Sequence, residues 1–388
     1  MSLLAPASEA ELAETVAGLT EPVEIRGGGT RAGLGRPVQA GATLSTEGLS
    51  GVSLYEPGAL TLVAGAGTPL AEIEATLAAE GQRLPFEPMD HRPLLGTTGE
   101  PTIGGVVSCN VSGPRRVQAG ACRDSLIGVR FVDGAGRAIR NGGRVMKNVT
   151  GYDLVKLMAG SHGTLGVLSE VAFKVLPAPE ATATLRIEGL SDAGAVAAMT
   201  AALTSPYDVT GAAHLPTGAD GASLTLIRVE GFEASVAYRA ERLKDLLSGR
   251  GETGLELGTI PERREDPWVA VRDARPFADR PGAVWRVSLK PSDAPALVAA
   301  LPEAEAFYDQ GGGLVWLRLE EGEDAGAEAV RGALAPLGGH ATLVRASPAI
   351  RAATPPFQPQ PAPLAAVSAG LRARFDPRGL LNPGRMAP

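Results

Sequence analysis

Residues 26–30 read Arg-Gly-Gly-Gly-Thr, residues 102–113 read Thr-Ile-Gly-Gly-Val-Val-Ser-Cys-Asn-Val-Ser-Gly, and residues 160–170 read Gly-Ser-His-Gly-Thr-Leu-Gly-Val-Leu-Ser-Glu. Glycine has no Cβ, so each stretch can let the backbone approach another group closely. In the first stretch, three successive N–H groups can point into one concavity that suits phosphate oxygens. A glycine-rich surface turn explains that stretch equally well by itself, but three such stretches together favour a bound ligand.

Neither of the common nucleotide-binding patterns is present in the first stretch. It matches neither Gly-x-Gly-x-x-Gly nor Gly-x-x-x-x-Gly-Lys-Ser/Thr, so the sequence does not support a Rossmann or P-loop site. Gly104 and Gly105 in the second stretch allow close approach of a flat ligand, and the polar side chains of Ser108, Asn110 and Ser112 can hydrogen-bond to it.

Strands and helices alternate around these stretches. We predict a helix capped by Ser8, a strand over 23–26 that runs into the first glycines, and a strand over 59–64. Thr68 is the expected N-cap and Pro69 the first residue of a helix that ends near Gly81. Further strands are expected over 126–132, 137–140 and 165–176. Pro177 and Pro179 end the last of these, and we place a domain boundary there.

The second part of the chain contains an internal repeat. Ser191-Asp-Ala-Gly and Ser292-Asp-Ala-Pro each open an alanine-rich helix, and both serines are expected N-caps. The order strand, helix, strand, strand, helix, strand occurs twice, which suggests two ferredoxin-like halves that share one antiparallel sheet. Chance similarity among alanine-rich helices is the alternative explanation.

Composition excludes several classes of protein. The chain has 388 residues, of which 44% are hydrophobic and 20% charged, as in a globular protein of about two domains. Its net charge of −7 and scattered basic residues argue against a nucleic-acid partner. Two cysteines, Cys109 and Cys122, are too few for a disulfide framework or an iron–sulfur cluster. We expect a cytoplasmic protein without a membrane-inserted segment, which reaches the inner face of the cell membrane only through partners.

The order of motifs resembles that of a known family. Beside the three glycine stretches, the chain carries G-T-P-L-A-E-I-E, M-K-N-V-T-G-Y-D-L and F-D-P-R-G-L-L-N-P-G-R-M. This set is similar to the FAD-binding oxidoreductases of the vanillyl-alcohol-oxidase type, also called PCMH-type. The pair W-R-V-S-L-K-P-S-D-A-P over 285–295 and G-G-H-A-T over 338–342 resembles the FAD-binding E-subunit family of bacterial glycolate oxidases (glycolate dehydrogenases). The resemblance covers nearly the whole chain.

The resemblance implies an α+β fold in three parts. A two-subdomain PCMH-type FAD-binding domain is expected over 1–179, and a ferredoxin-like α+β cap domain with a large antiparallel sheet over 180–350. A C-terminal helix and Asn-Pro-Gly segment over 351–388 would return to the FAD domain.

The implied cofactor is FAD, bound without a covalent link because the first loop has no histidine. Residues 26–31 would surround its pyrophosphate, and the second and third stretches would line the adenosine and isoalloxazine. No metal site is expected. The expected FAD-binding residues are Arg26, Gly27, Gly28, Gly29, Thr30, Arg31, Thr102, Ile103, Gly104, Gly105, Ser108, Cys109, Asn110, Ser112, Gly113, Gly163, Gly166, Val167 and Asn382.

Flavin-dependent oxidation of a 2-hydroxy acid needs a base, cations for the carboxylate and a flavin near the α-carbon. His340, Tyr152 and Arg286 are the candidate catalytic residues, with Lys290 as a second cation and Lys147 and Asp153 beside Tyr152. His162 is a further candidate to face the flavin. A structural role for each histidine, and a helix-cap network around Tyr152, are the alternatives.

Three hypotheses follow about function. The first is a subunit that oxidises glycolate to glyoxylate within a complex, together with a catalytic FAD-containing subunit and an iron–sulfur subunit. The second is a non-catalytic assembly subunit in which FAD is structural or absent. A self-sufficient 2-hydroxyacid dehydrogenase is weaker, because the histidine and acidic cluster of the related catalytic proteins is missing here.

Overall fold

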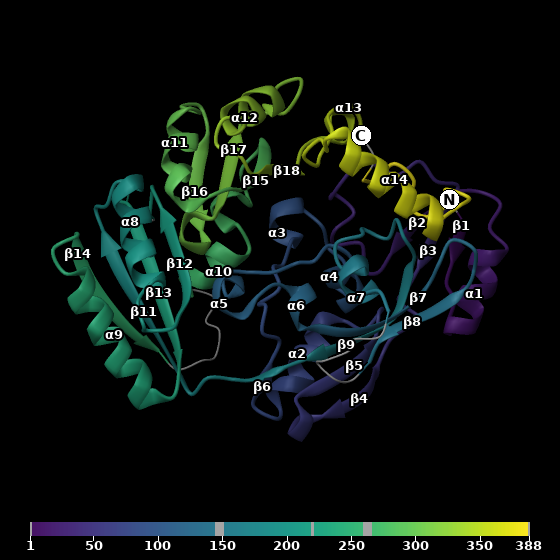
Figure 1. The fold of residues 1–388 in the computed structure, drawn as a ribbon, viewed down its shortest axis with the longest axis horizontal. Coiled ribbons are helices and arrows are strands. Elements are labelled where there is room, and N and C mark those ends of the chain that lie inside the picture. Colours follow the sequence, from purple (N-terminus) through teal and green to yellow (C-terminus); the bar gives the residue numbers. More distant parts are fainter. Residues whose placement is uncertain (1, 144–150, 219–220, 259–265, 387–388) are drawn as a thin grey trace. The chain divides into compact units, whose positions relative to one another are not determined.

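The computed structural model describes residues 2–143, 151–218, 221–258 and 266–386. They form two compact units (Figure 1). Unit 1 comprises Met1–Ser112, Gly120–Pro177 and Pro359–Pro388, and unit 2 comprises Gly113–Ala119 and Ala178–Gln358. The short segment 113–119 thus belongs to unit 2, although the segments before and after it in sequence belong to unit 1. The sequence did not indicate this.

The described residues of unit 1 form three sheets. An antiparallel sheet has the order β4 (Val52–Glu56), β5 (Thr61–Gly65), β9 (Val167–Lys174), β7 (Leu126–Val132), β8 (Ala138–Gly142). A parallel sheet has the order β1 (Ser2–Leu4), β3 (Ala42–Ser45), β2 (Val23–Arg26), and β6 (Gln82–Arg83) pairs with β10 (Leu176–Pro177). The helices are α1 (Glu9–Ala17), η1 (Pro57–Ala59), α2 (Leu70–Ala78), α3 (Arg92–Leu95), α4 (Ile103–Ser108), α6 (Cys122–Ser125), α7 (Leu154–Met158) and α14 (Ala362–Phe375).

Local signals explain most of these elements. Ser8 caps α1 as predicted, since its hydroxyl accepts a hydrogen bond from the Glu11 N–H at 3.2 Å. The predicted cap at Thr68 is wrong: Pro69 is the N-cap of α2. The Thr68 hydroxyl instead accepts from the Gly51 N–H at 2.9 Å and donates to the Gly65 carbonyl at 2.7 Å. Thr68 therefore fixes the turn that follows β5.

Unit 2 is built on an eight-stranded antiparallel sheet with the order β14-β11-β13-β12-β16-β17-β15-β18. Its first half is β11 (Ala181–Glu188), α8 (Asp192–Leu203), β12 (Val209–Leu215), β13 (Leu224–Gly231), α9 (Glu233–Leu247) and β14 (Glu252–Gly258). Its second half is β15 (Ala283–Ser288), α11 (Ala294–Ala299), β16 (Glu305–Asp309), β17 (Leu314–Leu319), α12 (Ala327–Leu334) and β18 (His340–Arg345). The remaining helices are α5 (Arg116–Ala119), α10 (Pro267–Arg272), η2 (Arg275–Phe277), η3 (Pro291–Asp293), η4 (Gln310–Gly312) and α13 (Pro348–Ala353).

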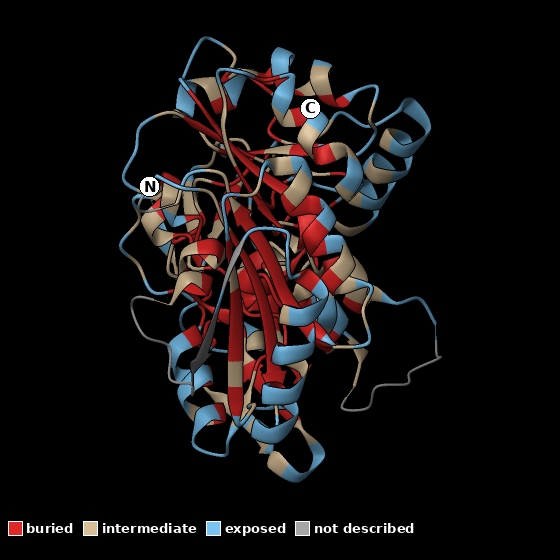
Figure 2. Ribbon diagram, turned by 90° about the vertical axis from the view of Figure 1, so that its left-hand side faces the viewer, coloured by how far each residue is buried: buried red, intermediate tan, exposed pale blue. Residues whose placement is uncertain are grey.

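The main core of unit 2 lies on one face of this sheet. Buried residues of α8, α9, α11 and α12 form one cluster with alternate residues of the strands, such as Trp285 and Val287 of β15. Figure 2 shows the buried strands in red and the exposed outer surfaces of helices in pale blue. Polar residues of the same strands, among them Arg286, therefore lie on the opposite face.

The two predicted serine caps differ in outcome. Ser191 accepts from the Gly194 N–H at 3.3 Å and caps α8 as predicted. Ser292 caps nothing: it lies inside η3, and Asp293 is the N-cap of α11. Pro291 starts the short 3-10 turn one residue before Ser292, which moves the helix start. None of the described helices is long and apolar enough to cross a bilayer.

Candidate functional site

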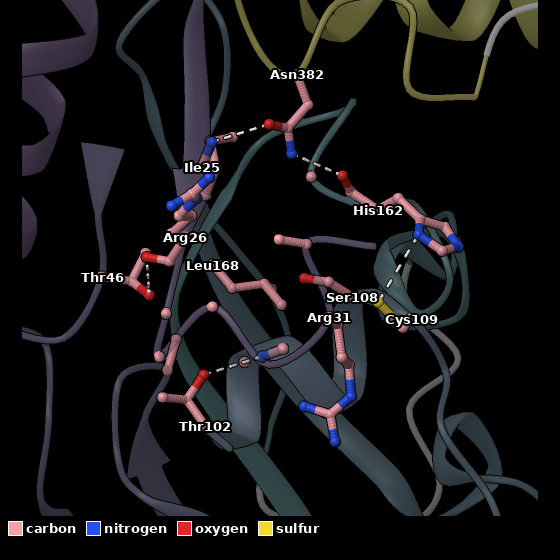
Figure 3. Close-up of a pocket in the computed structure, with 18 of the residues that line it drawn as sticks. Ile25, Arg26, Arg31, Thr46, Thr102, Ser108, Cys109, His162, Leu168 and Asn382 are labelled. Carbon is pink, nitrogen blue, oxygen red and sulfur yellow. Dashed lines mark hydrogen bonds between the residues drawn. The ribbon is translucent and has the colours of Figure 1, made fainter. Parts of the chain in front are cut away.

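The three glycine stretches and the C-terminal segment meet at one cavity in unit 1, shown in Figure 3. It encloses about 700 Å³ when the space open to solvent is included. The lining residues are Glu24, Ile25, Arg26, Gly27, Gly28, Gly29, Thr30, Arg31, Ala32, Thr46, Ala66, Thr102, Gly104, Gly105, Ser108, Cys109, His162, Gly163, Gly166, Leu168, Asn382 and Arg385. Most of the residues expected to bind FAD are in this set.

The first stretch offers a row of unused backbone donors. Strand β2 ends at Arg26, whose carbonyl accepts from the Thr46 N–H at 2.8 Å. After it, none of the N–H groups of residues 27–31 donates a hydrogen bond to any described part of the chain. Residues 27–29 are partly buried and residues 30–31 are buried, and successive unused N–H groups at a cavity wall suit the oxygens of an anionic ligand.

Glycine is required here by close backbone contact. A Cβ on Gly28 would lie 1.9 Å from the Glu100 carbonyl oxygen, and one on Gly27 would lie 2.2 Å from the Thr102 hydroxyl oxygen. Gly29 has φ +73°, a backbone conformation that residues with a Cβ rarely adopt. The segment 99–102 thus holds the glycine stretch in place from one side.

Charges around the cavity are only partly neutralised. Glu24 accepts from both Arg26 and Arg385, at 2.7 Å in each case. Arg31 is 8% exposed and makes only long contacts, 3.5 Å to the Thr30 hydroxyl and 3.4 Å to the Met89 carbonyl. Its Nε has no acceptor in the described chain, and burial lowers its pKa. Arg31 is therefore a buried cation of the cavity wall without an ion-pair partner among the described residues.

Asn382 joins three segments of the cavity wall, as Figure 3 shows. Its Oδ1 accepts from the Ile25 N–H at 2.8 Å, and its Nδ2 donates to the His162 carbonyl at 2.8 Å. Both ends of this side-chain amide are thus used by the protein. Asn382, expected as an FAD-binding residue, positions β2 and the third glycine stretch.

His162 lies beside Cys109 on the cavity wall, with its Nδ1 3.7 Å from the Cys109 sulfur. Burial, together with the charge of Arg385, lowers the pKa of His162 to about 4, so the imidazole is neutral at pH 7. Burial also raises the pKa of the Cys109 thiol. The pair therefore offers a neutral, polarisable surface rather than a nucleophile.

Five expected FAD-binding residues lie outside the cavity lining: Ile103, Asn110, Ser112, Gly113 and Val167. Ile103 and Val167 are buried in unit 1, and Gly113 belongs to unit 2. Asn110 Oδ1 accepts from the Arg123 N–H at 3.0 Å, and the Ser112 hydroxyl accepts from the Cys122 N–H at 2.9 Å. These two side chains hold the turn after α4.

The candidate catalytic residues are not among the residues that line the cavity. Tyr152 is 89% exposed, and its carbonyl accepts from Asn141 Nδ2 at 3.0 Å. Asp153 caps α7, as the helix-cap alternative predicts, while Lys147 lies outside the described residues. Arg286 and His340 belong to unit 2, on neighbouring strands β15 and β18.

Several residues that line the cavity were not identified from the sequence, namely Glu24, Thr46, Ala66, Leu168 and Arg385. The sequence did contain a signal for Arg385, since this residue directly follows Asn-Pro-Gly in the quoted C-terminal motif. No sequence signal pointed to Glu24, because a single acidic residue in a short strand usually faces the solvent.

The residues present fit FAD. The row of unused donors suits a pyrophosphate, the glycine contacts leave a narrow backbone cradle, and Ala66 and Leu168 supply apolar wall for a flat ring.

Comparison with known proteins agrees with this geometry. Residues 2–142 match the family model described as "FAD binding domain". The chain is 39% identical over 366 residues to the glycolate oxidase subunit GlcE of Escherichia coli (strain K12), covering 94% of this chain and 92% of that protein. It is 30% identical over 188 residues to the glycolate oxidase subunit GlcD of Bacillus subtilis (strain 168), covering 47% of this chain and 38% of that protein.

A solved structure of alkyldihydroxyacetonephosphate synthase has a similar fold, with a TM-score of 0.72 at 18% identity. The match covers 98% of this chain and 75% of that one. The mixed α and β architecture and the PCMH-type FAD-binding part of the predicted fold class are confirmed.

Proposed function

Since the chain belongs to the FAD-binding glycolate oxidase subunit family represented by GlcE, we propose that it is the FAD-binding subunit of a glycolate oxidase complex. The complex would oxidise glycolate to glyoxylate, which removes two electrons and two protons from the alcohol carbon and its hydroxyl. The row of unused N–H groups over residues 27–31 is the observation that carries the cofactor part of this proposal.

FAD supplies the electron acceptor when it is bound. In this proposal the N–H groups of residues 27–31 hold its pyrophosphate, and Arg31 contributes positive charge from the cavity wall. Thr30 stands in the first stretch and no histidine does, so the flavin is held without a covalent bond. Asn382 acts by holding β2 and the third glycine stretch in register.

Unit 2 is the second domain in this proposal. Its two strand-helix-strand-strand-helix-strand halves support the ferredoxin-like description over 180–350. Arg286 would bind the carboxylate of the substrate. His340 lies at the surface and would accept the hydroxyl proton, because partial desolvation and the charges of Arg286 and Arg116 lower its pKa and favour the unprotonated ring. We assign no step to Tyr152, since its side chain is 89% exposed and no charged group among the described residues interacts with it.

The proposed partners are a catalytic FAD-containing subunit and an iron–sulfur subunit, with electrons passing between them and this chain. Two cysteines cannot supply the four ligands of a common iron–sulfur cluster, so that centre must come from another chain. In this proposal the complex works in the cytoplasm, and any attachment to the membrane is through these partners.

An absorption spectrum of the chain purified alone tests the proposal. Flavin bands that leave the protein on acid precipitation would support non-covalent FAD, and bands that stay with the pellet would contradict that part. Anaerobic addition of glycolate then decides the role. Bleaching would make this subunit catalytic, while an unbleached flavin would support electron transfer. A colourless protein that takes up no added FAD would favour the assembly subunit.

A further inference from the structure

Positive charge gathers at a second place, on the face of the unit 2 sheet opposite its main core. Arg286 lies in register with Trp316 of β17 and Thr342 of β18, and Ser288 lies opposite His340. Trp285 and Val287, on either side of Arg286 in β15, belong to the core on the other face. Arg286, Thr342, Trp316 and His340 therefore share one surface.

A second arginine reaches this surface from α5. That helix packs against β12 and η4, and the preceding residue, Arg115, fixes it by two hydrogen bonds of 2.9 Å to Glu230. Burial first and then the charge of Arg116 lower the pKa of Arg286 to about 10, while Asp309 opposes the shift. Arg116 also acts on the pKa of His340. The two guanidinium groups are thus close enough to repel each other.

The repulsion is not relieved by an ion pair. Within the described residues, neither Arg116 nor Arg286 forms an ion pair or donates a side-chain hydrogen bond. Other arginines of unit 2 are well satisfied, such as Arg318, which donates to Glu305 and to the Pro281 carbonyl. Gln310, on η4 beside α5, has a buried Nε2 without an acceptor.

Two like charges that are partly desolvated and form no ion pair destabilise a fold, and such groups are common where a ligand supplies the negative charge. The nearby aromatic surface is compact: Phe307 stacks on Trp316 with ring centres 6.1 Å apart. A planar carboxylate can accept hydrogen bonds from a pair of guanidinium groups. The aromatic rings beside the arginines leave room for only a small substituent on that carboxylate.

We infer that Arg116 and Arg286 form the binding site of a small organic carboxylate in unit 2, next to Trp316 and His340. This rests on the proposed function only in taking the carboxylate to be a 2-hydroxy acid or its 2-oxo product. Lys290 does not take part, because its side chain is 72% exposed and lies 3.9 Å from Asp293.

Calorimetric titration of the purified, flavin-loaded protein with oxalate tests the inference, since oxalate has no hydrogen to lose and cannot be oxidised as glycolate is. Arg116→Met and Arg286→Met should each weaken binding by roughly tenfold or more, the loss expected for a charge-assisted pair. Lys290→Met removes the same charge nearby and should leave the affinity unchanged.

Thermal unfolding provides the second measurement. Without oxalate, Arg286→Met should melt at the same temperature as the wild type or higher, because the substitution removes an uncompensated charge. Oxalate should raise the melting temperature of the wild type and of Lys290→Met, but not of Arg286→Met.

Three results would overturn the inference: no oxalate binding by the wild type, binding of oxalate by both arginine variants with the wild-type affinity, or a response of the wild type to sulfate equal to its response to oxalate at the same concentration. The flavin content of each variant is measured separately. A wild type that contains no flavin would contradict the proposed function, yet it would still report on oxalate because both arginines belong to unit 2.

Discussion

Gly28 is the residue at which the flavin cavity depends most directly on the absence of a side chain. A Cβ there would lie 1.9 Å from the backbone oxygen of Glu100, which cannot move without displacing the second glycine stretch. We expect Gly28→Ala to cost about 1–3 kcal/mol of stability and to reduce the flavin retained after purification. Gly58→Ala is the control, because a Cβ on Gly58 meets nothing within 4 Å.

The measurement is the ratio of flavin absorbance to protein absorbance, together with the urea midpoint of unfolding. A Gly28→Ala protein with the same flavin content and midpoint as Gly58→Ala would show that the contact with Glu100 does not shape the site.

His162 makes stability depend on pH. Its pKa is lowered to about 4 in the folded chain, against about 6.5 in the unfolded chain, so the unfolded state binds more protons between these values. Stability should therefore fall as pH decreases from 6.5 towards 4, by about 2 kcal/mol at pH 5 from this group. In His162→Asn, which tolerates the φ of +51° at this position, that part of the pH dependence should disappear.

Urea unfolding of the wild type and His162→Asn at pH 7 and pH 5 measures the difference. If the two proteins lose equal stability between these pH values, His162 is not the group that titrates.

At the scale of elements, the sequence predicts what local signals determine. Strand β2 and helix α1 were predicted closely, because Ser8 caps the helix and glycines end the strand. The predicted caps at Thr68 and Ser292 were wrong. The Thr68 hydroxyl accepts a hydrogen bond from the distant Gly51 N–H instead of capping a helix. Ser292 lies inside a 3-10 turn that the neighbouring Pro291 begins.

For the cavity, motif order identified the glycine stretches but not Glu24, whose two arginine partners come from positions 26 and 385. The grouping of Arg116 with Arg286 was also missed. It depends on a short segment that joins unit 2, and no local pattern marks such a segment.

The two halves of the unit 2 sheet join through a buried polar cluster. Strands β12 and β16 pair at His214 and Tyr308, and the Tyr308 hydroxyl donates to Asp192 Oδ2 at 2.6 Å. His214 Nε2 lies 3.4 Å from Asp192 Oδ1. The contact with His214 and the hydrogen bond from Tyr308 lower the pKa of Asp192. Its carboxylate therefore stabilises the fold above the unfolded pKa near 4, and this contribution is lost as pH falls through the lowered pKa of the folded state.

We expect Tyr308→Phe to reduce the free energy of unfolding by about 1–3 kcal/mol at pH 7, the range for a hydrogen bond to a charged group. The deficit should shrink as pH falls below about 4, because the unfolded state then binds a proton that the folded Asp192 carboxylate, with its lowered pKa, takes up only at lower pH. Tyr238→Phe, at a position 60% exposed, should have no effect. A deficit that is the same at pH 7 and pH 3 would exclude the carboxylate as its source.

At the scale of the whole molecule, the chain returns to its own beginning to complete unit 1. Leu381 forms a parallel bridge with Val23, and Arg378 donates to the carbonyls of Val16, Ala17 and Leu19. Segments more than 350 residues apart thus form one edge of the cavity. FAD retention should therefore depend on residues far from the FAD binding domain matched over 2–142.

Asn382 tests this dependence, because its amide joins Ile25 of β2 to the carbonyl of His162. Asn382→Ala removes both hydrogen bonds and places alanine at a φ of +46°, whereas Asn382→Gly removes the same bonds without that strain. We expect each to lose about 2–4 kcal/mol of stability and most of its flavin, with glycine the less destabilised, as measured by urea unfolding and flavin absorbance. If Asn382→Gly kept the wild-type flavin content, the two hydrogen bonds would not hold the cavity together, and the returning segment would matter only through its backbone.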